Sequence, residues 1–441
     1  MMKLFFYMLF MIPSFFYSFS SWNLFQFMIL FLMLLFISFS GFSFFSVVSY
    51  NYGIDFYSYG LIILSMLIVS LMIISSSSIK NTFLSNFFLF VNLILCLSLI
   101  LVFSSMNMLI MYLFFEFSLI PLLILIYTWG YQPERLISGL YLFFYTLFAS
   151  LPFLLVVIYF MVSEMTLYFD MEFFVPYSFV IHLFMFFAFM VKLPMFMVHF
   201  WLPKAHVQAP VSGSMILAGL LLKIGGYGFI RFVTMYELSF LSFNYIWYSF
   251  SIMGCILVSM ICLIQGDVKC LIAYSSVAHM SMCLIGILTM TKWGMLGSFL
   301  MMLSHGLCSS GLFCLANFSY ERYSSRSFFL NKGLINLMPS MSFMWFMFCS
   351  FNMSCPPSLN FFSEVFIINS MMMYWSNSFF YFLFISFFSA CFSYFLYSYL
   401  QHGVPHLFYS YSLGSTREFL LMWVHLVPLI FLILGLNFFF S

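Results

Sequence analysis

Apolar runs of about 20 residues, separated by short polar segments, follow one another along almost the whole sequence. A run of this length can cross a bilayer as one helix, in which every backbone polar group is satisfied internally. Hydrophobic residues make up 65% of the chain and charged residues only 5%, far below the charged share of soluble domains. The sequence therefore predicts an all-α polytopic membrane protein, with a single transmembrane domain over residues 1–441.

Polar residues between the apolar runs predict about fourteen transmembrane helices. We expect them near 2–20, 22–41, 57–76, 86–104, 106–129, 140–163, 178–200, 212–233, 242–264, 270–289, 293–318, 338–372, 377–400 and 420–439. Proline removes a backbone donor and clashes with the preceding turn, so it breaks or kinks a helix. Pro194 should therefore break the seventh helix, and Pro356 with Pro357 should break the twelfth.

The two broken helices suggest an internal repeat. Spans 4–8 and 9–13 form two sets of five, and an odd number of spans would invert the second copy, as in inverted-repeat transporters. We expect four segments: an N-terminal three-helix part, two antiporter-like repeats, and a polar loop with a C-terminal helix. Their predicted limits are 1–80, 86–233, 242–400 and 401–441.

The positions of lysine and arginine predict the orientation, because cationic loops stay on the cytoplasm-equivalent side. If the loops alternate, one side collects eight of these residues: Lys80, Arg135, Lys204, Lys269, Arg322, Arg326, Lys332 and Arg417. The other side collects Lys3, Arg231 and Lys292, together with the acidic stretch from Glu164 to Glu172. We therefore expect Arg135 and Arg326 on the cytoplasm-equivalent side and both termini on the opposite side.

Six titratable residues lie near the middle of predicted spans: Glu116, Lys192, Lys223, His279, His305 and Glu364. A charged group at the bilayer centre costs about 2.5–3.5 kcal/mol on insertion scales, and such groups commonly form proton relays or counter-ion pairs. The competing interpretation is that they are paired or neutral residues that only hold helices together. A pair formed by Glu116 and Lys192 would have a proton affinity that depends on its spacing.

Two further histidines lie near a predicted membrane edge. His199 and His206 flank Trp201 to Lys204, where they could line a proton entry path or simply anchor the interface. The ten cysteines contain no C-x-x-C pair and are better explained as buried thiols than as metal ligands. The run GGYG at 225–228 lacks the spacing of a nucleotide-binding loop, so no cofactor site or metal site is predicted in this chain.

Several segments resemble one family closely, the chain 4 subunits of mitochondrial NADH:ubiquinone oxidoreductase. The resemblance rests on FEFSLIP around Glu116, GYQPERL at 130–136, VKLPMFMVHFWLPKAHVQAPVSGSMILAGLLLKIGGYG at 191–228, LIAYSSVAHM at 271–280, HGLCSSGLFCLANFSYER at 305–322 and NKGLINLMPS at 331–340. It covers most of the chain and is weakest before Tyr50 and after Tyr399. Gln208 is a departure, because members of this family often carry glutamate at that position.

The resemblance implies an antiporter-like, proton-pumping subunit of the membrane arm of respiratory complex I, in the mitochondrial inner membrane. It implies that Glu116, Lys192, Lys223 and Glu364 match the family's buried charged residues, and that the strongly cationic side is the matrix. The termini would then face the intermembrane space. It also implies that NADH, FMN, iron–sulfur clusters and ubiquinone are bound by partner subunits, among them neighbouring antiporter-like subunits of the membrane arm.

Two other functions remain open from the sequence. A stand-alone cation/proton antiporter would share the buried charges, whereas a structural membrane scaffold would use them only to pin helices together. Co-purification with a redox complex would separate the first function from the antiporter. Charge-removing substitutions that leave assembly intact would separate both from the scaffold.

Overall fold

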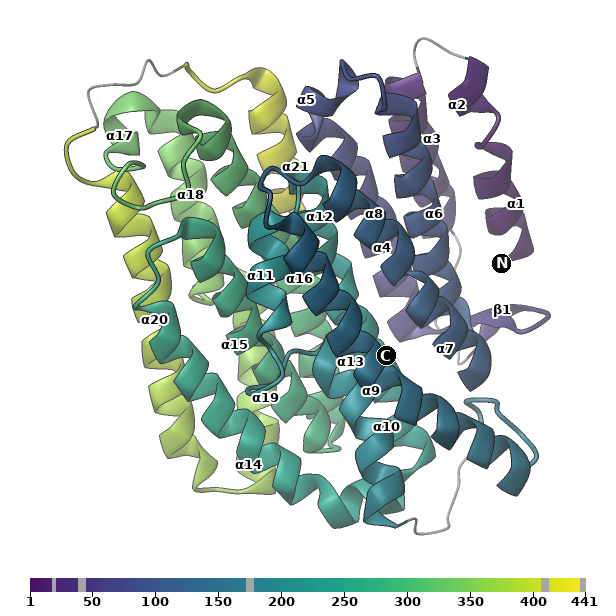
Figure 1. The fold of residues 1–441 in the computed structure, drawn as a ribbon. Coiled ribbons are helices and arrows are strands. Elements are labelled where there is room, and N and C mark those ends of the chain that lie inside the picture. Colours follow the sequence, from purple (N-terminus) through teal and green to yellow (C-terminus); the bar gives the residue numbers. More distant parts are fainter. Residues whose placement is uncertain (18–20, 39–44, 172–177, 406–411, 437–441) are drawn as a thin grey trace. The chain divides into compact units, whose positions relative to one another are not determined.

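A computed structural model describes residues 1–17, 21–38, 45–171, 178–405 and 412–436 (Figure 1). Within these ranges, nine helical stretches are long and apolar enough to cross a membrane. They are α4 (Phe56–Ser75), α6 (Ser85–Ser104), α7 with α8 (Met108–Trp129), α9 (Arg135–Ser163), α12 to α13 (Val211–Met235), α14 (Glu237–Cys262), α15 (Val268–Leu288), α16 (Lys292–Tyr323) and α20 (Ser378–Gln401). The chain is thus a predominantly helical, multi-pass membrane protein.

The chain divides into two compact units. The first unit consists of Met1–Lys192 with Gln208–Ser242, and the second consists of Leu193–Val207 with Phe243–Ser441. Each unit has its own core of apolar helices, and each contains some of the titratable residues selected from the sequence.

The N-terminal helices differ from the expected spans. Helix α1 (Met2–Phe10) ends well before residue 20 and is followed by the short α2 (Ser14–Tyr17). The prediction of one continuous helix here is wrong, because Pro13 cannot donate a backbone hydrogen bond and interrupts the first span. Helix α3 (Ser21–Ile37) follows.

A β-hairpin lies between α3 and α4, so the expectation of an exclusively helical fold needs correction. Strands β1 (Ser46–Ser49) and β2 (Tyr52–Ile54) pair antiparallel, and Tyr52 packs edge-on against Phe5 with ring centroids 5.0 Å apart. Figure 1 shows the hairpin close to the N-terminus. Its short strands are flanked by apolar runs, and this is why hydropathy alone did not predict it.

A buried ion pair ties the hairpin end of the first unit together. Asp55 lies at the N-terminus of α4, accepts a hydrogen bond from the backbone of Phe45 at 2.9 Å, and pairs with Arg231 of α13 (Leu222–Met235). The Arg231 guanidinium also lies 4.9 Å from the ring centroids of both Phe45 and Tyr227. The sequence counted Arg231, near the end of the predicted span 212–233, among the cations of one membrane side, but it is only 4% exposed, because Asp55, distant in the sequence, neutralises it.

Both predicted helix breaks are present. Helix α10 (Phe179–Lys192) ends two residues before Pro194, and α11 (Trp201–Gln208) begins only after an irregular segment. Helix α18 (Pro339–Asn352) is separated from α19 (Leu359–Tyr374) by the segment that contains Pro356 and Pro357. A third break, at Ser118 between α7 (Met108–Phe117) and α8 (Leu119–Trp129), was not predicted.

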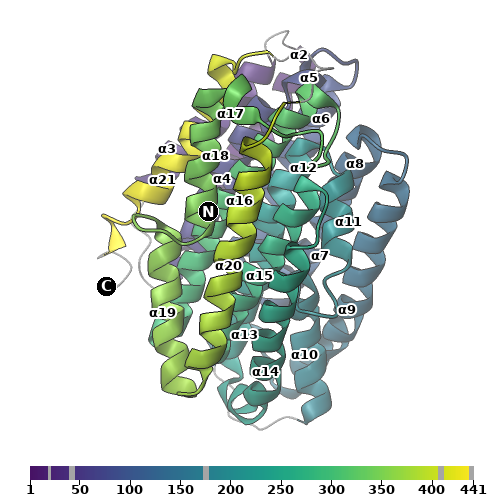
Figure 2. The same cartoon turned by 90° about the vertical axis from the view of Figure 1, so that its left-hand side faces the viewer.

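Close helix packing organises the second unit. Helix α16 packs along α15 and α19, and Figure 2 shows α20 running beside α18. A Cβ atom at Gly297 of α16 would lie 2.9 Å from Cβ of Phe366, so only glycine permits this approach of α16 to α19. Glu418 near the start of α21 (Thr416–Phe431) pairs with Arg322 at 2.7 Å. The predicted last span reaches residues 437–439, which lie outside the described ranges.

Candidate functional site

Helix α10 ends with Lys192 in the interior of the first unit. The Lys192 ammonium donates a hydrogen bond of 2.9 Å to the carbonyl oxygen of Phe115 on α7, and it lies 3.1 Å from the centroid of the Phe115 ring. The side chain of Lys192 is 3% exposed. The dipole of the Phe115 carbonyl and the face of the Phe115 ring thus stabilise the ammonium without a direct ion pair to a carboxylate.

Glu116 follows Phe115 directly and lies close enough to Lys192 for their charges to interact. One oxygen of its carboxylate is buried and has no hydrogen-bond partner in the protein. In the described parts of the chain, direct ion pairs join Asp55 to Arg231 and Arg322 to Glu418, so Glu116 and Lys192 interact without direct contact. Such an interaction is sensitive to small changes in spacing, because Coulomb energy varies strongly with distance at low dielectric.

Lys223 lies on the same unit, just after a π-helical turn. The π-helix η1 (Leu217–Leu221) connects α12 (Val211–Ile216) to α13, and the Lys223 ammonium donates to the carbonyl oxygen of Ala218 at 2.5 Å. The residue is 0% exposed. π-Helical turns inside α-helices are frequently found at functional sites. Here the wide turn brings a carbonyl five residues back within reach of a buried lysine.

The second unit brings His279 and His305 together. His279 is on α15 and His305 on α16, with ring centroids 5.6 Å apart and ring planes inclined by 47°. They are 3% and 1% exposed, respectively. Two imidazoles this close can exchange a proton directly or through one bridging group.

Glu364 lies on α19, next to the break that precedes this helix. The hydroxyl of Ser354, at the end of α18, donates to the Glu364 carboxylate at 2.5 Å. Ser354 has φ of 59°, a left-handed conformation that is uncommon for residues other than glycine. The irregular segment between the two half-helices therefore aims a hydroxyl at the carboxylate.

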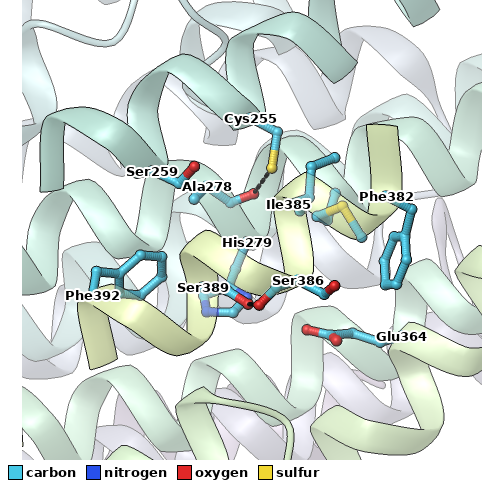
Figure 3. Close-up of a pocket in the computed structure, with 11 residues that line it drawn as sticks. Cys255, Ser259, Ala278, His279, Glu364, Phe382, Ile385, Ser386, Ser389 and Phe392 are labelled. Atoms are coloured by element: carbon cyan, nitrogen blue, oxygen red, sulfur yellow. Dashed lines mark hydrogen bonds between the residues drawn. The ribbon is translucent and has the colours of Figure 1, made fainter. Parts of the chain in front are cut away.

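A small cavity connects Glu364 with His279. Its volume is about 10 Å³, which is close to the space that one water molecule requires. Figure 3 shows Ser386 and Ser389 of α20 beside the His279 ring, with Glu364 on the same side of the cavity. Hydroxyls between a carboxylate and an imidazole supply the groups that a chain of hydrogen bonds needs.

We expect replacement of Ser354 to slow proton transfer through Glu364. A hydrogen bond to a charged group contributes about 1.5–3 kcal/mol, so Ser354→Ala should reduce pumping about tenfold at equal complex content. Ser354→Gly is the matched variant, because glycine accepts the positive φ but also lacks the hydroxyl. The two variants should be equally impaired in vesicle pumping assays. Normal pumping by the glycine form would mean that Ser354 matters only for its backbone conformation.

His199 and His206, which the sequence places near a predicted membrane edge, are both buried in the protein. They are 1% and 0% exposed, and both belong to the second unit. The His206 ring stacks parallel on Phe313 with centroids 4.6 Å apart, and the His199 ring stacks on Phe200 at the same distance. Each histidine is thus buried with its ring against an aromatic side chain, so any role in proton entry would require a path through protein.

Gln208 contacts a carboxylate. Its side-chain amide donates a hydrogen bond of 3.2 Å to the carboxylate of Glu134, the residue directly before Arg135 at the start of α9. A glutamate at this position would place two carboxylates together, whereas the amide is a donor. The departure from the family pattern therefore coincides with a hydrogen bond that only the amide can make.

The structure adds a buried cation that the sequence assigned to a loop. Lys269, near the start of α15, is 2% exposed and lies 5.6 Å from the ring centroid of Tyr320. Its charge interacts with Arg326 and Glu321.

Buried polar atoms with no protein partner also occur at Asn92, Ser212 and Gln401. Single polar residues within apolar runs were the available signal, but their burial could not be inferred from sequence.

Known proteins similar to this chain are subunits of one respiratory enzyme. The chain is 48% identical to NADH-ubiquinone oxidoreductase chain 4 of Ceratitis capitata, over 98% of each protein. It is 47% identical to the protein of that name from Locusta migratoria over 97% of each, and 54% identical to that of Aedes aegypti over 74% of each. Its fold matches a chain of respiratory complex I from Thermus thermophilus with a TM-score of 0.87 at 20% identity, covering 99% of this chain and 96% of that chain.

The fold and its buried acids and bases define an antiporter-like membrane subunit. Residues 105–393 match the family model described as NADH:quinone oxidoreductase/Mrp antiporter, TM. Residues 1–102 match the model for the amino terminus of NADH-ubiquinone oxidoreductase chain 4. The chain belongs to the NADH-ubiquinone oxidoreductase chain 4 family.

Proposed function

We propose that six titratable side chains carry protons across the membrane in this chain: Glu116, Lys192 and Lys223 in the first unit, and His279, His305 and Glu364 in the second. As a member of its family, the chain is a proton-pumping, membrane-arm subunit of respiratory NADH:ubiquinone oxidoreductase in the mitochondrial inner membrane. The observation that carries the proposal is the position of Lys192, a buried ammonium held by the Phe115 carbonyl beside Glu116.

In the first unit, the proton on Glu116 controls the charge on Lys192. When Glu116 is ionised, its negative charge favours the protonated ammonium of Lys192. When Glu116 accepts a proton, that attraction disappears and Lys192 more readily releases its own proton. Lys223, held by the Ala218 carbonyl, is the next buried base in this unit, and the proposal requires that it titrate together with Glu116 and Lys192.

In the second unit, protons pass among His305, His279 and Glu364. The two imidazoles adjoin one another, and the cavity lined by Ser386 and Ser389 leads from His279 towards Glu364. Ser354 donates to the carboxylate and so stabilises its ionised form until a proton arrives. In this proposal, the hydroxyls in the cavity and a single water connect His279 with Glu364.

Electron transfer belongs to other subunits in this proposal. NADH, FMN, the iron–sulfur clusters and ubiquinone are bound by partner subunits, and this chain carries no redox centre. Its neighbours in the membrane arm include further antiporter-like subunits. The family assignment supports this division of labour.

The chain crosses the membrane fourteen times, with inverted repeats at 86–233 and 242–400, between an N-terminal part at 1–80 and a C-terminal part at 401–441. The broken helices at Pro194 and at Pro356–Pro357 support this repeat.

Both termini face the intermembrane space. Arg135 and Glu164 lie at opposite ends of α9, as this orientation requires, whereas Glu172 lies outside the described residues. Thiol labelling on the two sides of the membrane checks the orientation, which fails if residues 135 and 164 react from the same side.

Replacement of Glu364 tests the proposed function. Glu364→Gln should reduce proton movement driven by NADH oxidation about 100-fold, the scale of a lost proton-transfer group, while the complex still assembles. Glu237→Gln, at an exposed position on α14, is the matched control and should pump normally. The measurement is proton movement and NADH:quinone turnover in reconstituted vesicles at equal complex content. Unchanged pumping would favour the scaffold, and transport without an associated redox complex would favour the stand-alone antiporter.

A further inference from the structure

A cavity of about 540 Å³ lies at the hairpin end of the first unit. It is bounded by the start of α1, the last two turns of α3 and the β-hairpin. Its apolar walls include Leu4, Leu32, Leu35 and Phe36, and its volume is within the range of small-molecule sites. No residue assigned above to proton transfer takes part in it.

Polar groups collect at one end of this cavity. Lys3 is in the first turn of α1, Ser38 follows the last residue of α3, and Ser49 is in β1. The hydroxyl of Ser49 is buried and has no hydrogen-bond partner in the protein. The start of α1 and the end of α3 meet here, and the ends of apolar helices are expected at the edge of a bilayer, with the apolar walls formed by α1 and α3.

Lys3 has no acidic counterpart in this part of the chain. The first 54 residues contain no aspartate or glutamate, and Lys3 is their only lysine or arginine. The first acidic residue, Asp55, is already paired with Arg231. Lys3 itself is exposed and takes part in neither ion pair of the described residues. An anionic group is therefore the partner that this end of the cavity favours.

The surrounding surface indicates that the ligand comes from the bilayer. Large apolar side chains on α1 and α3, the helices that wall the cavity, are exposed, among them Phe6 at 61%, Phe10 at 82% and Phe31 at 54%. Such faces are stable against lipid tails. Apolar walls beside a basic membrane edge match a molecule with a hydrocarbon chain and an anionic headgroup.

We propose that this cavity binds an anionic phospholipid, with an acyl chain between α1 and α3 and the headgroup phosphate at Lys3. The Ser49 hydroxyl donates a hydrogen bond to the headgroup. The lipid fills the space between α1 and the rest of the first unit. Tyr7 of α1 spans this space by donating a hydrogen bond of 3.2 Å to the carbonyl oxygen of Met28.

Photolabelling of the full chain in nanodiscs tests this proposal. Diazirine-bearing phosphatidylglycerol should label peptides from α1 and α3 more strongly than the same probe on phosphatidylcholine. Lys3→Gln should lower phosphatidylglycerol labelling there about fivefold, the effect expected for one basic residue near an anionic headgroup. Lys80→Gln, an exposed lysine outside the cavity, is the matched control and should change nothing.

A second pair of variants tests the acyl-chain path. Leu35→Trp should fill the cavity and abolish labelling of α1, whereas Leu34→Trp, on an exposed position outside the lining, should not. Equal labelling of wild type by the two lipids would overturn the proposal even if every variant failed to fold. Labelling seen in the isolated chain but lost in the assembled complex would also overturn it, because a protein partner would then cover the cavity.

Discussion

Lys223→Ala is expected to reduce coupled proton pumping by about 100-fold or more while the complex still assembles. The ammonium of Lys223 is completely buried and is hydrogen-bonded to Ala218 within a π-helical turn, so no surface lysine can substitute for it. Removal of the side chain removes a base from the proposed route in the first unit. Proton movement and NADH:quinone turnover, measured in vesicles at equal complex content, provide the readout.

Lys223→Arg distinguishes charge from proton release. Arginine preserves the positive charge but holds its proton too tightly to pass it on, so pumping should remain close to that of the alanine variant. Lys292→Arg, at an exposed position at the start of α16, is the matched control and should pump as wild type does. If Lys223→Arg pumps normally, the residue serves as a fixed charge and does not relay protons.

Glu116→Gln is expected to have the second large effect. The amide retains the shape of the side chain, but it cannot become negative and change the charge state of Lys192. Pumping should fall about 100-fold with assembly retained. Glu116→Asp should keep part of the activity, because the charge remains and only its distance from Lys192 changes.

The control for Glu116 is Glu164→Gln, which alters a carboxylate at the C-terminal end of α9, away from Lys192. This variant should pump as wild type does. The proposed switch would be refuted by equal pumping of wild type and Glu116→Gln, and Glu116 would then be a structural residue. A loss of assembled complex in both glutamine variants would instead point to a general requirement for carboxylates in folding.

The sequence by itself determined the membrane class, most of the long spans and the two broken helices. Apolar run length decides whether a segment can cross a bilayer, and proline acts on the backbone wherever it occurs, so both are local properties. Glu116, Lys192, Lys223 and Glu364 could be selected for the same reason, because each is a charge inside an apolar run. The motifs around them also indicated the family.

Only the tertiary structure decided how these residues are held. Phe115 and Lys192 are far apart in the sequence, yet the Phe115 carbonyl binds the Lys192 ammonium. Asp55 similarly pairs with the buried Arg231, which the sequence had counted only among the cations of one membrane side. The π-turn before Lys223 and the left-handed Ser354 beside Glu364 depend on the packing of neighbouring helices. The charge and hydropathy of a segment can be read from its own residues. The partner of a buried charge depends instead on which distant segments the fold brings together.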